Sequence, residues 1–444
     1  MNKIIKLFAV SIGFLFVTSC ADLNELAPIN SIPTNTAFAD RASSLAAING
    51  VYSDLQDGTL AFDGYLGLPQ LFTDETVFTG TFPTRLEFGN KNVFPSNGTM
   101  AGVFTDFYEV INRANNVIAA VPNVEDESFT AEERNDVIAQ ARFVRGQMYL
   151  QLVTLWIEVP IILDPTVEVG EVLNVARSSE DAVYAQVIDD LTFARENLTT
   201  ASSVNFASVQ SATAFLARVA LYNEDWMNAW ALAQEALAGV DLSTVPFLDD
   251  QIYSLGFTPT DGNSLAFFYG PAEVGGRYSI APSQTLIDAF EPGDLRFSQT
   301  LELDFLPATP FGVKYPSFAD ANSGSATDPV YFIRHAEMVL IIAEAAAELG
   351  DFSAANAAFD QVRARAGLGP IELTSANFVD AILAERFVEF ALEGNFRLLD
   401  LRRRGLDLQV LGPLGYDECD RVWPLPQRDI DRNINLMQND CCNC

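Results

Sequence analysis

The chain has 444 residues, and its 59 acidic residues against 26 lysines and arginines give a formal net charge of −33. A surface this acidic repels phosphate backbones and excludes a nucleic-acid partner, because proteins that bind nucleic acids need basic patches. Hydrophobic residues make up 49% of the chain, which excludes a wholly disordered protein. The length is enough for two or three average domains, or for one large domain built from repeats.

The N-terminus has the pattern of a cleaved export signal. Two lysines precede an apolar run over 7–17, which is too short to span a bilayer as a permanent helix. The following Val17-Thr18-Ser19-Cys20 resembles the lipobox of bacterial lipoproteins, in which the cysteine is acylated and becomes the first mature residue. We therefore expect residues 1–19 to be removed, Cys20 to be lipidated and residues 20–36 to form a tether. An ordinary signal peptide with a chance cysteine is the alternative.

Helical periodicity dominates the chain that follows. Thr130 and Glu133 have the spacing of a capping box, which predicts the start of a long helix. In the other segments apolar residues recur on one helical face. The expected helices cover residues 38–55, 104–121, 130–156, 178–198, 208–222, 225–238, 282–290, 331–349, 352–366 and 376–393.

Two long segments break this periodicity. They cover residues 58–103 and 239–330 and are rich in glycine, proline, phenylalanine and tyrosine. Apart from the helix expected over 282–290, we predict irregular loops there, with short strands or helices at most. These insertions are the candidates for a ligand-binding face, because binding residues are found disproportionately on loops that a rigid scaffold positions.

Two of the helix pairs share a local code. Trp226 is followed by Ala229 and Phe352 by Ala355, in each case at the start of a second helix. An aromatic residue followed by a small one lets two helices approach closely and is typical of tetratricopeptide-like pairs, although any helical hairpin can show it. We predict a mainly α fold with a tetratricopeptide-like helical-repeat scaffold. It forms a single domain over residues 37–444, with repeats over 131–238 and 331–404.

Four further cysteines lie near the C-terminus, at Cys419, Cys441, Cys442 and Cys444. Outside the cytosol an even number favours disulfides, and four cysteines allow three pairings. We expect one or two bridges. Free thiols and a zinc site are the alternatives, and zinc is disfavoured because adjacent Cys441 and Cys442 lack the usual spacer between ligands.

Two segments carry a family resemblance. Residues 141–161 include Ala141, Gly146, Tyr149, Leu155-Trp156 and Val159-Pro160-Ile161, and residues 385–401 read Glu-Arg-x-x-Glu-Phe-x-x-Glu-Gly-x-x-Arg-x-x-Asp-Leu. With Pro424-Leu425-Pro426 and Cys20, this pattern resembles the SusD/RagB family of outer-membrane nutrient-uptake lipoproteins. Two features depart from the family: the tail, where Ile434 replaces a usual proline and a cysteine-rich end follows Asn439, and the length, because the chain is shorter than many members.

The resemblance implies a function at the outer membrane. Such a protein is a non-enzymatic, lipid-anchored surface protein without a cofactor, which captures a nutrient, an oligosaccharide in the first instance. It delivers the ligand to a SusC-like TonB-dependent transporter and acts as its lid. Asp22 and Glu25 loosely resemble the signal that sends these lipoproteins to the cell exterior. The alternatives are a lipid-anchored glycosidase and a periplasmic protein scaffold, and a peptide or another small nutrient is an alternative ligand.

The residues that could suggest catalysis have simpler interpretations. Glu385 and Glu389 lie on one helical face with Arg386 at the adjacent turn, which favours ion pairs in a scaffold. A glycosidase needs two carboxyls across a cleft. His335 is the only histidine and lies in an apolar segment, so we expect an imidazole in the core or a groove.

Sugar rings pack on aromatic side chains, and their hydroxyls hydrogen-bond to Asp, Asn and Arg. In the family an acidic residue after the first helix is among the ligand contacts, and Asp74 is the match here. No tryptophan lies in either insertion, which favours a short oligosaccharide over a long polysaccharide. From composition alone, the remaining predicted ligand-binding residues are Phe78, Phe82, Arg85, Tyr278 and Tyr315.

Overall fold

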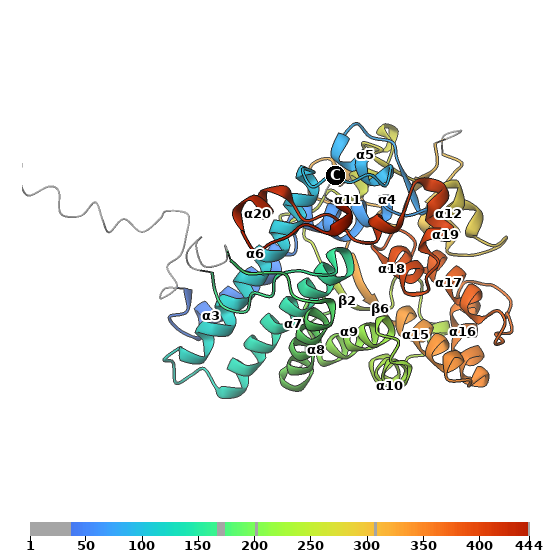
Figure 1. The fold of residues 1–444 in the computed structure, drawn as a ribbon. Coiled ribbons are helices and arrows are strands. Elements are labelled where there is room, and N and C mark those ends of the chain that lie inside the picture. The colour runs from blue at the N-terminus through green and yellow to red at the C-terminus, as the bar shows by residue number, and fades with distance from the viewer. Residues whose placement is uncertain (1–36, 167–173, 200–202, 306–308, 443–444) are drawn as a thin grey trace, which may run out of the picture.

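The computed structural model describes residues 37–166, 174–199, 203–305 and 309–442. The predicted signal peptide and tether, Cys20 among them, lie outside these residues, as does Cys444. Figure 1 shows the long helices side by side along one side of the molecule, with short helices and loops across the other. The predicted mainly α fold on a tetratricopeptide-like scaffold is confirmed.

Each long helix of the scaffold packs on the next. The pairs are α6 with α7, α7 with α8, α8 with α9 and α9 with α10. Helix α10 also packs on α15, which continues the helical layer across the second insertion, and α15 packs on α16 and α17. The helices are α3 (Arg41–Asp54), α6 (Gly98–Ala120), α7 (Ala131–Trp156), α8 (Glu180–Asn197), α9 (Val209–Tyr222), α10 (Trp226–Leu237), α15 (His335–Glu348), α16 (Phe352–Arg365), α17 (Phe378–Glu389) and α18 (Phe396–Arg403).

Side-chain caps start several helices where the sequence predicts them. The capping box of α7 is present: the Glu133 N–H donates to Thr130 Oγ1 at 3.2 Å, and the Thr130 N–H donates to Glu133 Oε2 at 3.1 Å. Helices α10 and α16 begin alike, because Asp225 and Asp351 each accept from the N–H three residues on. The two helices that share the aromatic and alanine spacing therefore also begin with the same kind of aspartate cap.

The helix predicted over 331–349 is wrong at its beginning. Val330–Arg334 form strand β6, which pairs antiparallel with β2 (Gln251–Leu255), and α15 begins only at His335. Every residue of β6 is buried. A short apolar run enclosed on all sides has no period that separates strand from helix, so the distant partner strand decides its conformation.

The first insertion is more helical than predicted. Thr59–Gly67 form a π-helix that leads into α4 (Leu68–Leu71), and β1 (Thr76–Phe78) and α5 (Pro83–Gly89) follow. Helix α6 begins at Gly98, six residues before the predicted start at Phe104. Leu60 to Gly67 are all buried. A segment enclosed on every side shows no amphipathic stripe, which explains why periodicity did not reveal it.

The second insertion contains only short elements between longer irregular stretches. Their pairing links the insertions, because β3 pairs antiparallel with β1 of the first insertion, and Phe78 lies opposite Ile280. The remaining short strands β4 and β5 pair with each other. The elements are α11 (Leu265–Tyr269), β3 (Ile280–Pro282), α12 (Gln284–Ala289), α13 (Phe297–Thr300), β4 (Leu301–Glu302), β5 (Phe311–Gly312) and α14 (Phe318–Ala321).

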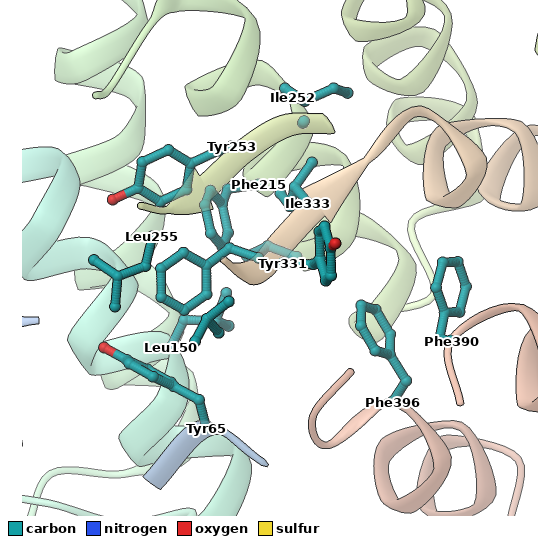
Figure 2. Packing of buried hydrophobic residues seen from close by; sticks show 14 of the residues in the cluster. Tyr65, Leu150, Phe215, Ile252, Tyr253, Leu255, Tyr331, Ile333, Phe390 and Phe396 are labelled. Atoms are coloured by element: carbon teal, nitrogen blue, oxygen red, sulfur yellow. The ribbon is translucent and has the colours of Figure 1, made fainter. Parts of the chain in front are cut away.

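Aromatic rings pack around the β2–β6 pair at the centre of the core, as Figure 2 shows. Tyr253 stacks on Phe332 with ring centroids 5.3 Å apart, and Tyr65 from the π-helix meets Phe332 edge-on at 4.8 Å. Phe143 of α7 packs edge-on against Tyr253 at 5.0 Å. These contacts join the first insertion, the scaffold and the second insertion in one core.

A disulfide joins Cys419 to Cys441, with their Cα atoms 5.2 Å apart. One of the predicted bridges is therefore present. The loop it closes contains α20 (Gln427–Arg432), so the bridge holds the C-terminal segment to the body. Within the described ranges, no helix is long and apolar enough to cross a membrane.

Candidate functional site

Asp74 lies where the first insertion meets the C-terminal motif. Its two carboxylate oxygens accept from Nε and Nη2 of Arg397 at 2.8 and 2.7 Å. The residue is 5% exposed, and its backbone carbonyl accepts from Ser283 Oγ at 2.5 Å. This predicted ligand contact is therefore occupied by an ion pair beneath the surface.

Tyr315 is also enclosed. It is 1% exposed, its hydroxyl donates to the Leu392 carbonyl at 2.8 Å, and its ring stacks on Tyr269 at 5.6 Å. Tyr315 thus supports the turn at Leu392, and Asp74 is buried against Arg397. Neither side chain presents a free face to a ligand.

Of the remaining predicted ligand-binding residues, Phe82 is the one with an exposed aromatic ring. Pro83 occupies the first position of α5, which keeps Phe82 extended at φ −79° and ψ 115°. The Phe82 ring is flanked by two guanidinium groups, with Arg85 Cζ at 5.1 Å and Arg277 Cζ at 4.3 Å from its centroid. Phe82 remains 38% exposed. The site thus offers an aromatic ring together with hydrogen-bond donors.

The two insertions supply this cluster jointly. Phe78 lies in β1, and the backbone carbonyl of Tyr278, just before β3, accepts from Thr79 Oγ1. The Tyr278 hydroxyl donates to the Pro310 carbonyl at 3.0 Å. We call Phe78, Phe82, Arg85, Arg277 and Tyr278 the Phe82 cluster. The structure thus places four of the six predicted ligand-binding residues on β1, at the start of α5 and just before β3, and it buries Asp74 and Tyr315.

Arg85 is held in place by a buried partner. Its Nε and Nη2 donate to the Asp63 carboxylate at 2.7 and 2.9 Å, and its guanidinium lies 4.6 Å from the Phe268 ring centroid. Arg85 is 8% exposed and Asp63 is 5% exposed. Burial raises the pKa of Asp63, whereas its bond to Arg85 opposes that shift. Arg85 therefore fixes the position of Phe82 more than it reaches toward solvent.

Arg277 was not predicted as a site residue. It lies in a tight turn after Gly275 and Gly276, and a Cβ on Gly276 would lie 1.9 Å from the Gly270 carbonyl oxygen. Only glycine fits that approach, and the turn delivers Arg277 to the Phe82 ring. The Gly-Gly-Arg-Tyr run is a sequence signal for such a turn, but nothing in it names the ring that the arginine meets.

The C-terminal motif forms a buried ionic network. Glu389 is fully enclosed and contacts Arg296, Arg334 and Arg365 at 2.9, 2.8 and 2.5 Å. Burial alone would raise the pKa of Glu389, but these guanidinium groups outweigh it and hold the pKa well below its ordinary value. The interpretation of Glu389 as part of an ion-paired scaffold agrees with this geometry.

Two other charged residues of α17 pair with residues outside that helix instead of with each other. Glu385 pairs with Arg296 at 2.7 Å, and Arg386 turns to Asp400 at 2.6 Å instead of pairing with either glutamate. His335 opens α15, where its Nδ1 lies 2.9 Å from the Asp250 carbonyl oxygen and its Nε2 lies 3.2 Å from the Gln210 side chain. His335 thus links the second insertion to α9 by hydrogen bonds.

Glu75 makes the stability of the fold depend on pH. Burial raises the pKa of Glu75 to about 8, although the Leu392 N–H and the nearby Lys314 and Arg397 oppose the shift. Because the folded pKa lies above the unfolded one, the proton on Glu75 stabilises the fold fully below the unfolded pKa, and this contribution is lost as the pH rises through 8.

We expect Glu75→Gln to remove this loss. Between about pH 5 and pH 9 the unfolding free energy of the variant should fall by about 3–4 kcal/mol less than that of the wild type. Denaturant titrations at several pH values measure the difference, with the exposed Glu235→Gln as the control. Parallel pH profiles for Glu75→Gln and wild type would contradict the assignment.

Two family models match the chain. The model of the SusD family matches residues 310–441, and a model described as starch-binding and associating with the outer membrane matches residues 80–221. SusD-like protein P2 of Formosa agariphila is 28% identical, over 96% of this chain and 97% of that protein. SusD-like protein P38 of the same organism is 24% identical, over 98% of this chain and 97% of that protein.

Solved structures share the fold. A laminarin-binding SusD-like protein superposes with a TM-score of 0.79 at 24% identity, covering 91% of this chain and all of that one. A SusD superfamily protein from Bacteroides vulgatus gives a TM-score of 0.81 at 21% identity, covering 91% and 99%. The helical scaffold and its insertions are therefore a common architecture among these proteins.

Proposed function

Since the chain belongs to the SusD/RagB family, we propose that it is a carbohydrate-binding protein whose ligand packs on the Phe82 cluster. The observation that carries this proposal is the exposed Phe82 ring between Arg85 and Arg277. The apolar face of a sugar ring packs on the phenyl ring, and the exposed Arg277 guanidinium donates to its hydroxyls. Asp74 and Tyr315 are buried, so we do not propose that they touch the ligand.

The ligand we propose is a short glucose oligomer. Laminarin is bound by one structural neighbour, and starch is named in one family description, so both glucans are the first candidates. A single exposed ring in the cluster suits one or two sugar residues rather than a long stacked chain.

Phe82→Ala is expected to weaken binding of these oligosaccharides about tenfold, which is ~1.4 kcal/mol and within the range for a lost aromatic contact. Calorimetry with glucose oligomers prepared from laminarin and from starch measures the effect. Leu86→Ala is the matched control, because Leu86 is 43% exposed on the same helix but lies outside the cluster. Wild-type affinity in Phe82→Ala would place the ligand elsewhere.

We further propose that the protein binds its ligand without transforming it. Glu385 and Glu389 are enclosed and ion-paired, so they do not face each other across a cleft as glycosidase carboxyls do. Incubation of the protein with the same glucans should release no reducing ends. Sustained release by the wild type above that of a blank would overturn the proposal in favour of an enzyme.

The partner we propose is a SusC-like TonB-dependent transporter in the outer membrane. The family description that mentions the outer membrane supports this location. We propose that residues 1–19 are removed, that the lipid on Cys20 and the tether 20–36 hold the body 37–444 at the cell exterior, and that the body closes over the transporter as a lid. Such tethering raises the effective concentration of captured ligand beside the transporter.

Co-purification tests this partnership. A tagged chain extracted from its own outer membrane with mild detergent should bring a large β-barrel protein with it, and metabolic labelling should place lipid on the chain. Cys20→Ser should abolish the labelling and still yield a folded, glycan-binding body. Recovery without any barrel protein would overturn the lid, and labelling that persists in Cys20→Ser would overturn the anchor.

A further inference from the structure

A cavity of about 500 Å³ lies between α6 and the C-terminal segment that contains α20. Its floor is apolar and comes from Phe104, Ile111 and Leu436, which are all nearly buried. Pro160 and Ile162 complete one wall. None of the lining residues belongs to the Phe82 cluster. A cavity of this volume is within the range of small-ligand sites.

Positively and negatively charged side chains line the rest of the cavity. Glu109 of α6 and Arg432 of α20 are exposed, and neither side chain has a hydrogen-bond or ion-pair partner among the described residues. Arg428 lies 3.4 Å from Asp429 and donates to the Ala101 carbonyl at 3.0 Å. Two arginines and two acids thus line the cavity.

This balance of charge indicates the chemistry of a ligand. An anionic ligand would meet the carboxylates, and a cationic one would meet the guanidinium groups, at a cost in either case. A neutral molecule rich in hydroxyls can donate to the acids and accept from the arginines at once, while its apolar face rests on the floor. Those are the properties of a neutral sugar.

The cavity is preformed. The Tyr108 hydroxyl donates to the Pro160 carbonyl at 2.7 Å, and Asn115 Nδ2 donates to the Ile162 carbonyl at 3.0 Å, which fixes one wall against α6. On the other side, Arg428 Nη2 donates to the Ala101 carbonyl of α6 at 3.0 Å, and Asn433 Nδ2 donates to the Val175 carbonyl at 2.7 Å. A preformed site avoids the ordering cost of binding.

Hydrogen bonds link α20, beside the cavity, to the segment between α5 and α6. The Gln427 N–H at the start of α20 donates to the Pro95 carbonyl at 2.9 Å, and Asn97 Nδ2 donates to the Thr84 carbonyl of α5 at 2.8 Å. Phe94, in the same segment, is 47% exposed.

We propose that the cavity between α6 and α20 is a second saccharide subsite, which takes neutral sugar residues of a glucan whose other part lies on the Phe82 cluster. This inference rests on the proposed function and extends it from a short oligomer to a longer chain. Occupying both places makes the second contact intramolecular, so longer chains bind more tightly than short ones without any change at the Phe82 cluster.

The experiment compares short and long glucose oligomers on one set of variants. Wild type is expected to bind the long oligomers at least tenfold more tightly than the short ones. The double variant Glu109→Ala, Arg432→Ala should lose most of that gain and keep its affinity for short oligomers. Asp431→Ala is the matched control, because Asp431 is exposed on α20 but does not line the cavity, and it should retain the gain.

The outcomes separate the subsite from the proposed function. If wild type shows no gain with length, or the double variant keeps the full gain, the subsite is overturned while the Phe82 cluster stands. If wild type binds neither short nor long oligomers, the proposed function itself fails. Loss of the gain in Asp431→Ala as well would mean that α20 as a whole is disturbed, and would also overturn the assignment to this cavity.

Discussion

Arg334→Met is expected to lower the free energy of unfolding by about 3–5 kcal/mol, because it leaves buried carboxylates without a partner. The Arg334 side chain is 1% exposed and contacts Asp250, Glu389 and Glu393, each at 2.8 Å. Methionine has a similar volume, so the expected loss comes from the charge and its hydrogen bonds and not from a cavity. Protonating Asp250 or Glu389 instead would cost free energy as well, since the neighbouring arginines lower the pKa of both carboxyls.

Chemical denaturation followed by far-ultraviolet circular dichroism measures this loss. The matched control is Arg195→Met, whose ion pair with Glu235 is at the surface, with side chains 36% and 49% exposed. Exposed pairs contribute about 0–1 kcal/mol, so the control should stay within that range. An equal loss of unfolding free energy in both variants would show that the loss does not depend on burial of the ion pairs.

Trp423→Ala should destabilise the protein by about 3–5 kcal/mol through the cavity it leaves. The side chain is fully enclosed, with ring centroids 4.7 Å from Phe88 and 5.3 Å from Trp156, both edge-on. The backbone joins the same contact, because the Trp423 N–H donates to the Leu155 carbonyl and Trp156 Nε1 donates to the Pro424 carbonyl, both at 3.0 Å. The ring therefore attaches the C-terminal segment to α7.

The same denaturation experiment tests this prediction. Met227→Ala is the control, because Met227 is 72% exposed and should change the free energy of unfolding by less than about 0.5 kcal/mol. A loss below about 1 kcal/mol in Trp423→Ala would mean that the neighbouring rings close over the space. A thiol assay on both variants, showing the disulfide still formed, excludes reduction as the cause.

Helix prediction succeeded where the signal is local. Thr130 and Glu133 lie three residues apart, and the cap they form depends on no other part of the chain. The matching starts of α10 and α16 are local in the same way. The strand Val330–Arg334 was missed because its partner lies about 80 residues earlier, and an enclosed apolar run looks alike in either conformation.

In the candidate site, too, local features were predicted and contacts between distant segments were not. Phe82 and Arg85 are three residues apart at the start of a short helix, so their proximity is a local property. Asp74 was predicted to touch the ligand, but Arg397, 323 residues away, takes both of its carboxylate oxygens. No residue near Asp74 in the sequence predicts this ion pair with Arg397. Arg277 reaches the Phe82 ring only because β1 and β3 pair.

The sequence by itself determined the helical scaffold, most helix boundaries, the family pattern and the two insertions from which the candidate site is built. These follow from periodicity, caps and short motifs, which act within a few residues. Only the tertiary structure decided which insertion residues are exposed and which are buried in ion pairs. That choice depends on contacts between distant segments, because burial and charge pairing are set by whatever the fold brings alongside each side chain.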